Sequence, residues 1–141
     1  MPRLTLTLPL ALAVAGPALA QQPTDPYLRR ARAVLARTPL IDGHNDLPWR
    51  IREDSLHPRD VDAYDLRTRT PGMTDLARLK QGMLGAQFWS VYIPGEIRDS
   101  GYARVELEQI DIARRVIAKY PDRLAWALSA DDIRREFLRS P

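Results

Sequence analysis

The sequence predicts an α/β protein with parallel strands. Segments with helical apolar spacing alternate with short apolar or aromatic runs, in the order helix, strand, helix, strand, helix, strand, helix. The chain has 141 residues and no Cys, which suits one domain or less. A closed (β/α)₈ barrel needs roughly 200 residues or more, so this length predicts either a small open sheet or the front part of a larger fold.

Residues 1–20 differ from the rest of the chain. They carry one cation, Arg3, then a short apolar run interrupted by Pro9 and Pro17, and the small residues Ala18 and Ala20. This layout is typical of a secretory signal peptide. We expect cleavage after Ala20 and an exported, periplasmic or secreted protein without a stable membrane anchor, with residues 21–141 as its mature part. A buried or membrane-anchoring helix is the alternative.

The first half of the mature chain is predicted to hold two helices and one strand. "YLRRARAVLAR", residues 27–37, has apolar residues on one helical face, and Pro39 follows it. "LID" then forms a short buried strand that leads into a polar cluster. Residues 48–72 are rich in turn formers and predict a long loop with at most a helical turn, and residues 74–82 predict a short helix that Gly82 ends.

The second half is predicted to hold two strands and two helices. The aromatic run "GAQFWSVYIP", residues 85–94, predicts the second strand, with Phe88 and Trp89 in the core. Residues 102–120 predict the longest helix, ended by Pro121, and "LAWAL", residues 124–128, predicts a third strand. Ser129 and Asp132 form a capping-box pattern at the start of a last helix. The stripe expected to be buried on the longest helix is Val105, Ile110, Ala113, Val116, Ile117 and Tyr120.

The charge pattern argues against nucleic-acid binding. The net charge is +3, and Arg residues alternate with Asp and Glu, as on a solvated helix face. A protein that binds nucleic acid would gather its cations on one surface. No Ser- or Cys-based triad and no glycine-rich phosphate loop can be assembled from this sequence.

The polar cluster "DGHND", residues 42–46, is the best candidate site. Side chains two apart in a strand share a face, so Asp42, His44 and Asp46 are expected on one side and Asn45 on the other. An imidazole and a carboxylate at the carboxyl end of a strand are two ligands of the kind that Zn²⁺ takes. By itself the spacing is also compatible with Asx turns at Asn45 and Asp46 and a buried, hydrogen-bonded His44. His57 is expected to be a surface histidine.

Three blocks of the chain resemble the N-terminal part of the membrane (renal) dipeptidase family, peptidase family M19. They are "PLIDGHNDLPW", "MTDLARLKQGMLGAQFWSVYIP" and "LEQIDIARRVIAKYPDRL", and the likeness covers about residues 27–139. The resemblance implies a (β/α)₈ barrel, of which about three strands are expected here. It also implies a metallodipeptidase with two zinc ions per site and a dipeptide as substrate. A homodimer of the full-length form is compatible with the resemblance.

The resemblance assigns His44 and Asp46 as ligands of one of the two zinc ions. The family's bridging Glu, its remaining His ligands and its catalytic residues come from later strands, and no residue of this chain matches them. We therefore expect the chain alone to have little or no activity. The alternatives are a non-catalytic binding module derived from the same barrel and another metal-dependent amide hydrolase, although many of the latter carry H-x-H on the first strand.

Overall fold

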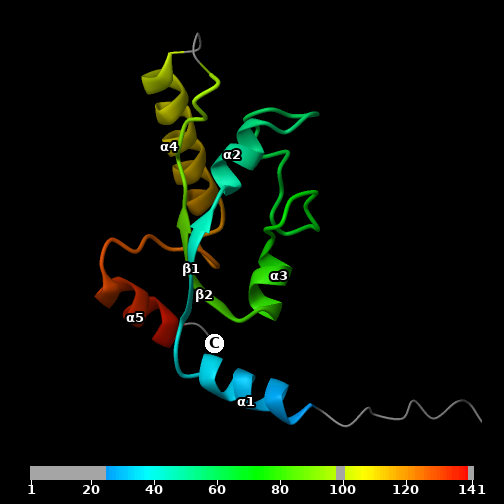
Figure 1. Cartoon of the computed structure of the whole chain (residues 1–141), viewed down its shortest axis with the longest axis vertical. Coiled ribbons are helices and arrows are strands. Elements are labelled where there is room, and N and C mark those ends of the chain that lie inside the picture. The colour runs from blue at the N-terminus through cyan, green and yellow to red at the C-terminus, as the bar shows by residue number, and fades with distance from the viewer. Residues whose placement is uncertain (1–24, 98–100, 140–141) are drawn as a thin grey trace, which may run out of the picture.

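The computed structural model describes residues 25–97 and 101–139, so the expected signal peptide lies outside the described residues. Two strands and five helices form along this part of the chain (Figure 1). None of the described helices is long and apolar enough to cross a membrane. In chain order the elements are α1 (Pro26–Leu35), β1 (Leu40–Asn45), α2 (Leu47–Arg52), α3 (Leu76–Gln81), β2 (Leu84–Trp89), α4 (Tyr102–Lys119) and α5 (Ala130–Arg139).

The two strands pair in parallel, which confirms the predicted α/β class and strand direction. The connection between them holds α2, a long loop and α3. The pairing is irregular at two points: Leu40 pairs with Leu84 but Ile41 with Ala86, and Asp42 pairs with Gln87 but Asn45 with Trp89. Each strand therefore carries an extra residue relative to its partner, β2 near Gly85 and β1 at residues 43–44.

The core lies between α2, the loop at residues 53–75 and α4, rather than over the sheet. α2 packs against α4, and the loop contributes three buried apolar side chains of its own. Partly buried Leu76, Trp89 and Leu124 pack at the margin of this cluster. The core residues are Leu47, Ile51, Val61, Tyr64, Leu66, Ile112, Val116 and Tyr120.

Aspartate side chains order the long loop. Asp54 accepts hydrogen bonds from the backbone N–H groups of Leu56 and His57, and Asp60 does the same for Asp62 and Ala63. These backbone N–H groups hold the pKa of both carboxyls below the usual range. The loop predicted at residues 48–72 is confirmed from residue 53 onward, whereas residues 48–52 belong to α2. The loop is folded by its own Asx turns and packs as part of the core.

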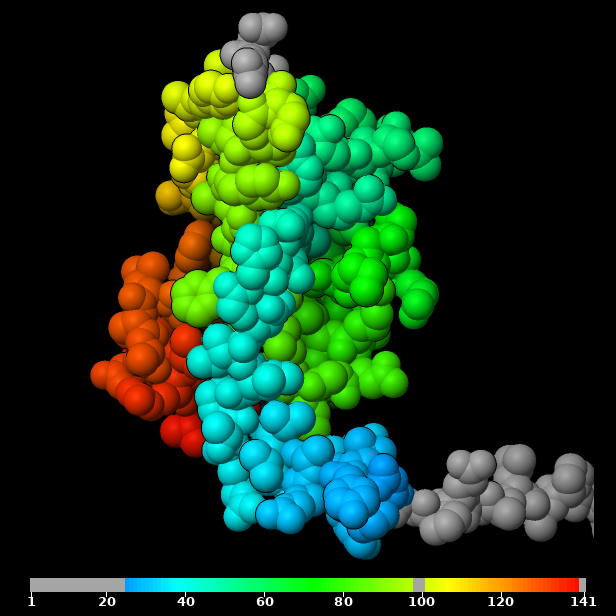
Figure 2. All heavy atoms as spheres, in the orientation of Figure 1, coloured from blue at the N-terminus to red at the C-terminus, as the bar shows by residue number. Residues whose placement is uncertain are grey.

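Several burial predictions are wrong. β1 is not a buried strand, since Leu40 and Ile41 are exposed, and the side chain of Phe88 on β2 is 62% exposed. Figure 2 shows atoms of β1 in cyan at the molecular surface. On α4, Ile110 is exposed and Ile112 is buried in its place. The core is formed on the helix and loop side, so the sheet has no apolar layer over these residues.

The predicted third strand at residues 124–128 is also wrong. Within the described ranges the sheet has two strands, and this segment is irregular. Its start is held by Leu124 N, which donates to Tyr120 O, and its end by Leu128 N, which donates to Asp132. Trp126 and Leu128 are exposed. The polar groups at both ends of the segment are bound to the neighbouring helices, so they do not pair with β2.

The remaining helix predictions are confirmed. α3 ends at Gly82 as expected, and α4 begins at Tyr102 and ends directly before Tyr120. The capping pattern at α5 is present, because Asp132 N donates to Ser129 Oγ at 3.2 Å and Ser129 Oγ donates to Asp132 Oδ2 at 2.9 Å. α1 has an apolar face but no buried residue.

Candidate metal site

His44 and Asp46 lie together at the carboxyl end of β1. His44 is the fifth residue of the strand, and Asp46 is the residue before α2. The distance between His44 Nε2 and Asp46 Oδ1 is 3.0 Å, so the two side chains meet as predicted, although Asp46 lies beyond the strand with φ −94° and ψ 32°. Their side chains are 68% and 45% exposed, which excludes a buried structural histidine at this position.

The spacing of these two atoms suits a shared cation. Ligand atoms about 2.0–2.1 Å from a tetrahedral zinc ion are roughly 3.3 Å from each other. In this structure the two atoms form a hydrogen bond at 3.0 Å, which a shared ion would replace with the atoms slightly further apart, and their exposure leaves the site accessible. The donor set of an imidazole nitrogen and a carboxylate oxygen also fits Zn²⁺.

These two residues form an incomplete ligand set within the described ranges. No group of three or more His, Cys, Asp or Glu residues that could hold a metal ion is found there. A catalytic zinc site has three protein ligands. His44 and Asp46 are therefore two donors of the kind that zinc takes, one fewer than a catalytic zinc site has.

Asp42 lies behind this pair and links the two strands. Its Oδ2 accepts from Gln87 Nε2 of β2 at 2.8 Å, and its Oδ1 accepts from the backbone N–H of His44 at 3.1 Å. These hydrogen bonds, that of Gln87 first, lower the pKa of Asp42, so the carboxylate is ionised at neutral pH. Gln87 Oε1 in turn accepts from Trp89 Nε1 at 2.7 Å. The sequence placed Asp42 on the site face but gave no role to Gln87, whose only signal is an amide inside an apolar strand.

Asn45 joins the end of β1 to the loop. Its Nδ2 donates to Thr74 Oγ1 at 3.2 Å, and its Oδ1 accepts from Leu47 N at 3.0 Å, which is an Asx turn at the start of α2. The Asx turn at Asn45, which belonged to the alternative interpretation of this cluster, is therefore present. The side chain of Asp46 makes no capping hydrogen bond to α2, and its carboxylate contacts His44 instead.

An ion pair between buried Asp75 and partly buried Arg78 holds the loop segment that Asn45 contacts. Asp75 is 1% exposed, accepts from Arg78 N at 2.8 Å and pairs with Arg78 Nε at 2.7 Å. Arg78 also donates to the carbonyl of Gly72 and to Thr70 Oγ1. The backbone N–H of Arg78, together with its guanidinium, lowers the pKa of Asp75. Residues 70–75 are thus tied to α3 beside the site.

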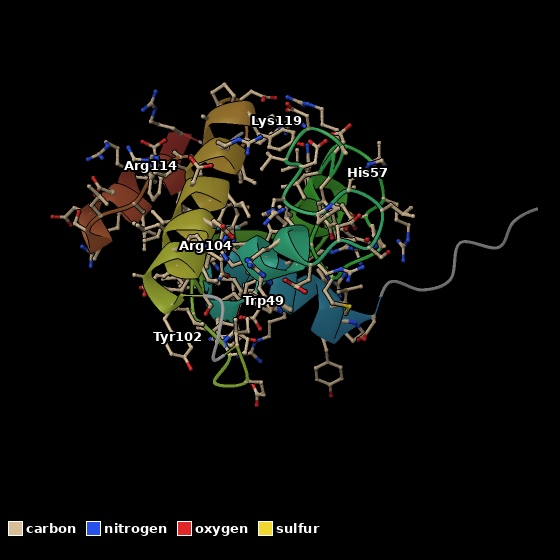
Figure 3. All side chains as sticks on the ribbon, turned by 90° about the horizontal axis from the view of Figure 1, so that it is seen from above. Trp49, His57, Tyr102, Arg104, Arg114 and Lys119 are labelled. Carbon is tan, nitrogen blue, oxygen red and sulfur yellow. The ribbon has the colours of Figure 1, made fainter. Side chains whose placement is uncertain are left out.

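The other candidate residues are not members of the His44–Asp46 pair. His57 is exposed on the loop after α2, and Figure 3 shows it well apart from Trp49, which confirms the predicted surface histidine. The rings of Trp49 and Tyr92 are in contact at a tilt of 45°, with centroids 5.8 Å apart, and the Arg52 guanidinium lies 5.2 Å from the Trp49 ring centroid. Of the two aromatic residues expected in the core, Phe88 is exposed and Trp89 packs against the core.

Comparison with known proteins gives one family and several close relatives. The sequence model of the family described as "Membrane dipeptidase (Peptidase family M19)" matches residues 28–140. Mouse "Dipeptidase 3" is 46% identical over 111 residues, which cover 78% of this chain and 22% of that protein. "Dipeptidase ataJ" of Aspergillus terreus is 40% identical over 121 residues, covering 80% of this chain and 29% of that protein. "Dipeptidase verJ" of Clonostachys rogersoniana is 40% identical over 119 residues.

The match covers most of this chain but a small part of each relative. The shares of these three relatives that align with the chain are 22%, 29% and 30%. The chain therefore spans less than a third of the length of the curated relatives it matches.

Proposed function

Since the chain belongs to the membrane dipeptidase family, peptidase family M19, we propose that it forms part of a zinc-dependent dipeptidase in which His44 and Asp46 bind one of two zinc ions. The observation that carries this proposal is the 3.0 Å separation of His44 Nε2 and Asp46 Oδ1 at the carboxyl end of β1. Enzymes with barrels of parallel strands build their active sites at this end. The parallel β1–β2 pair with helices in its crossover supports the front part of such a barrel.

Each residue of the site has a defined task in this proposal. The imidazole nitrogen of His44 and the carboxylate of Asp46 act as two ligands, and Asn45 holds the strand end in place through Thr74. The chemistry that zinc supplies when bound is the activation of water at neutral pH for hydrolysis of a peptide bond. The substrate class, a dipeptide, follows from the relatives that are named dipeptidases.

We further propose that the 141-residue chain by itself does not turn over dipeptides. Two protein ligands are fewer than the three of a catalytic zinc site. Export after cleavage at Ala20 and a homodimer of the full-length form stay predictions. The alternative, a non-catalytic binding module, would show cooperative thermal unfolding of the chain together with no zinc binding.

The test is a calorimetric titration of the 141-residue chain with Zn²⁺, with variants His44→Ala, Asp46→Ala and His57→Ala. We expect each of the first two to weaken zinc binding by about tenfold or more, because each removes one ligand. His57→Ala is the matched control, since it removes an exposed histidine away from the site. Unchanged binding in His44→Ala and Asp46→Ala contradicts the metal site. Hydrolysis of Gly-D-Ala at a rate comparable to a full-length relative contradicts the inactivity of the chain.

A further inference from the structure

Three side chains form a continuous line of hydrogen bonds beneath the candidate metal site. Trp89 Nε1 donates to Gln87 Oε1, Gln87 Nε2 donates to Asp42 Oδ2, and Asp42 Oδ1 accepts from the backbone N–H of His44. The line begins on β2, crosses to β1 and ends at the residue that carries the imidazole. Each donor faces an acceptor, so the order of amide, carboxylate and backbone groups is fixed.

The line ends where β1 is irregular. Between the pairs Asp42–Gln87 and Asn45–Trp89, β1 has one more residue than β2. Such a bulge changes the direction of the side chains on the strand. Gly43 lies inside it, and a Cβ built there meets nothing within 4 Å, so side-chain packing does not fix the bulge at this residue. The hydrogen bond from the backbone N–H of His44 to the Asp42 carboxylate spans this bulge.

We infer that Asp42 and Gln87 are positioning residues for the metal site, which rests on the proposed function of His44 and Asp46. The Gln87–Asp42 hydrogen bond, backed by Trp89, holds the β1 bulge in the conformation that turns the His44 imidazole toward Asp46. Neither Asp42 nor Gln87 is a ligand in this arrangement. Residues that orient ligands in this way change metal affinity by about 10–100-fold when they are substituted.

The inference can be tested by exchanging the carboxylate and the amide between positions 42 and 87. In Asp42→Asn, one of the two acceptor oxygens becomes an NH₂ group, so either Gln87 or His44 N loses its partner. In Gln87→Glu, a carboxylate oxygen faces the Asp42 carboxylate, and two negative charges repel. In the double variant Asp42→Asn/Gln87→Glu, the amide NH₂ at position 42 donates to the carboxylate at position 87, which still accepts from Trp89. The amide oxygen at position 42 still accepts from His44 N. The double variant therefore restores every hydrogen bond and keeps the total charge.

The experiment measures the zinc dissociation constant and the thermal midpoint of the 141-residue chain and these three variants. We expect each single variant to weaken zinc binding by about tenfold or more, and the double variant to return to within about threefold of the parent chain. In metal-free samples, the Trp89 indole N–H and His44 amide resonances are expected to move in both single variants and to return in the double variant. Asp122→Asn, which makes the same chemical change at the surface Arg67–Asp122 pair, is the control.

The outcomes separate this inference from the proposed function. If His44→Ala loses zinc binding while Asp42→Asn and Gln87→Glu bind as the parent chain does, the inference is overturned and the proposed function stands. A double variant as weak as the single variants also overturns it, because the exchange should restore the line. If His44→Ala binds zinc unchanged, the proposed function fails and the inference fails with it. A purely structural role, which would lower the thermal midpoint without a matching change in zinc affinity, overturns the inference as well.

Discussion

At the scale of single residues, two tyrosines of the same core have opposite surroundings. The Tyr120 hydroxyl accepts from the backbone N–H of Leu66 at 2.8 Å and donates to Asp65 Oδ1 at 2.9 Å. The Tyr64 hydroxyl is buried and has no hydrogen-bond partner among the described residues. Both rings are buried, so the hydroxyl groups alone distinguish them.

This difference predicts opposite effects of removing the two hydroxyls. Tyr120→Phe leaves the Leu66 N–H without its partner and should lower the free energy of unfolding by about 1–3 kcal/mol. Tyr64→Phe is the matched control and should be neutral or stabilising, because it removes a polar group that lacks a partner. Urea unfolding of both variants at pH 7 measures the difference. If both variants lowered the free energy of unfolding equally, the Leu66–Tyr120 hydrogen bond would make no separate contribution to stability and the prediction would be wrong.

Tyr120 also predicts that the free energy of unfolding depends on pH. Burial, with a smaller contribution from the neighbouring Asp65, raises the pKa of Tyr120 to about 12 from 10.0. Between pH 10 and 12 the unfolded chain loses this proton and the folded chain keeps it, so the unfolded state binds fewer protons and stability falls as pH rises. The difference in the free energy of unfolding between the parent chain and Tyr120→Phe should therefore become smaller between pH 10 and 12. A difference that stays constant from about pH 9 to 12 would contradict the raised pKa.

At the scale of elements, the junction between the two strands depends on a glycine. A Cβ at Gly85 would lie 2.7 Å from Pro39 Cβ and 2.9 Å from Pro39 Cα. Pro39 precedes β1, and its ring cannot move away without shifting the strand that follows. Gly85 also lies at the irregular pairing of β2 with Leu40 and Ile41. The close approach of Pro39 therefore requires the absence of a side chain.

We predict that Gly85→Ala lowers the free energy of unfolding by about 1–3 kcal/mol, as overpacking does. Gly43→Ala, a glycine of the neighbouring strand whose Cβ position is open, should change stability by less than about 0.5 kcal/mol. Thermal or urea unfolding of the two variants gives the comparison. The reverse order, with Gly43→Ala the more damaging, would contradict the close approach at Pro39.

The elements also show how far the sequence alone predicts this structure. Local signals were sufficient for every described helix except α2, since apolar spacing, Pro121 and the Ser129–Asp132 cap act within a few residues. They did not predict α2, of which residues 48–52 were expected in the long loop. They failed for residues 124–128, because whether an apolar run becomes a strand depends on an edge with which it can pair. They also failed for Phe88, because its burial depends on which face of the sheet another element covers.

The candidate site shows the same division. The contact of His44 with Asp46 was predicted from the two-residue repeat of a strand, but in the structure Asp46 lies just beyond β1 and the strand is bulged between Asp42 and Asn45. The link from Asp42 to Gln87 joins residues 45 apart in sequence, and no local pattern contains it. The β1 bulge follows from that pairing and could not be predicted either. Contacts between segments that are distant in sequence leave no local pattern from which they could be predicted.

At the scale of the whole molecule, apolar surface and open strand edges remain exposed on the described part of the chain. β1 and β2 each have one strand neighbour there, so each has one edge without a pairing strand. Leu40, Ile41 and Phe88 are exposed on these strands, and the β1 atoms lie at the surface in Figure 2. Open edges with apolar side chains favour pairing with other chains.

We therefore predict that the 141-residue chain self-associates in a concentration-dependent manner, through the sheet rather than through its loops. Phe88→Lys places a charge on the exposed side of β2 and should shift the chain toward monomer, as lysine does on natural edge strands. Met73→Lys is the matched control, because Met73 is 87% exposed in the loop and gains the same charge away from the sheet. Sedimentation velocity over about a hundredfold range of concentration measures the shift. Association at the strands would be contradicted if the parent chain stayed monomeric at all concentrations. It would also be contradicted if Met73→Lys shifted the chain toward monomer as much as Phe88→Lys, because only Phe88→Lys changes the surface on which strand pairing depends.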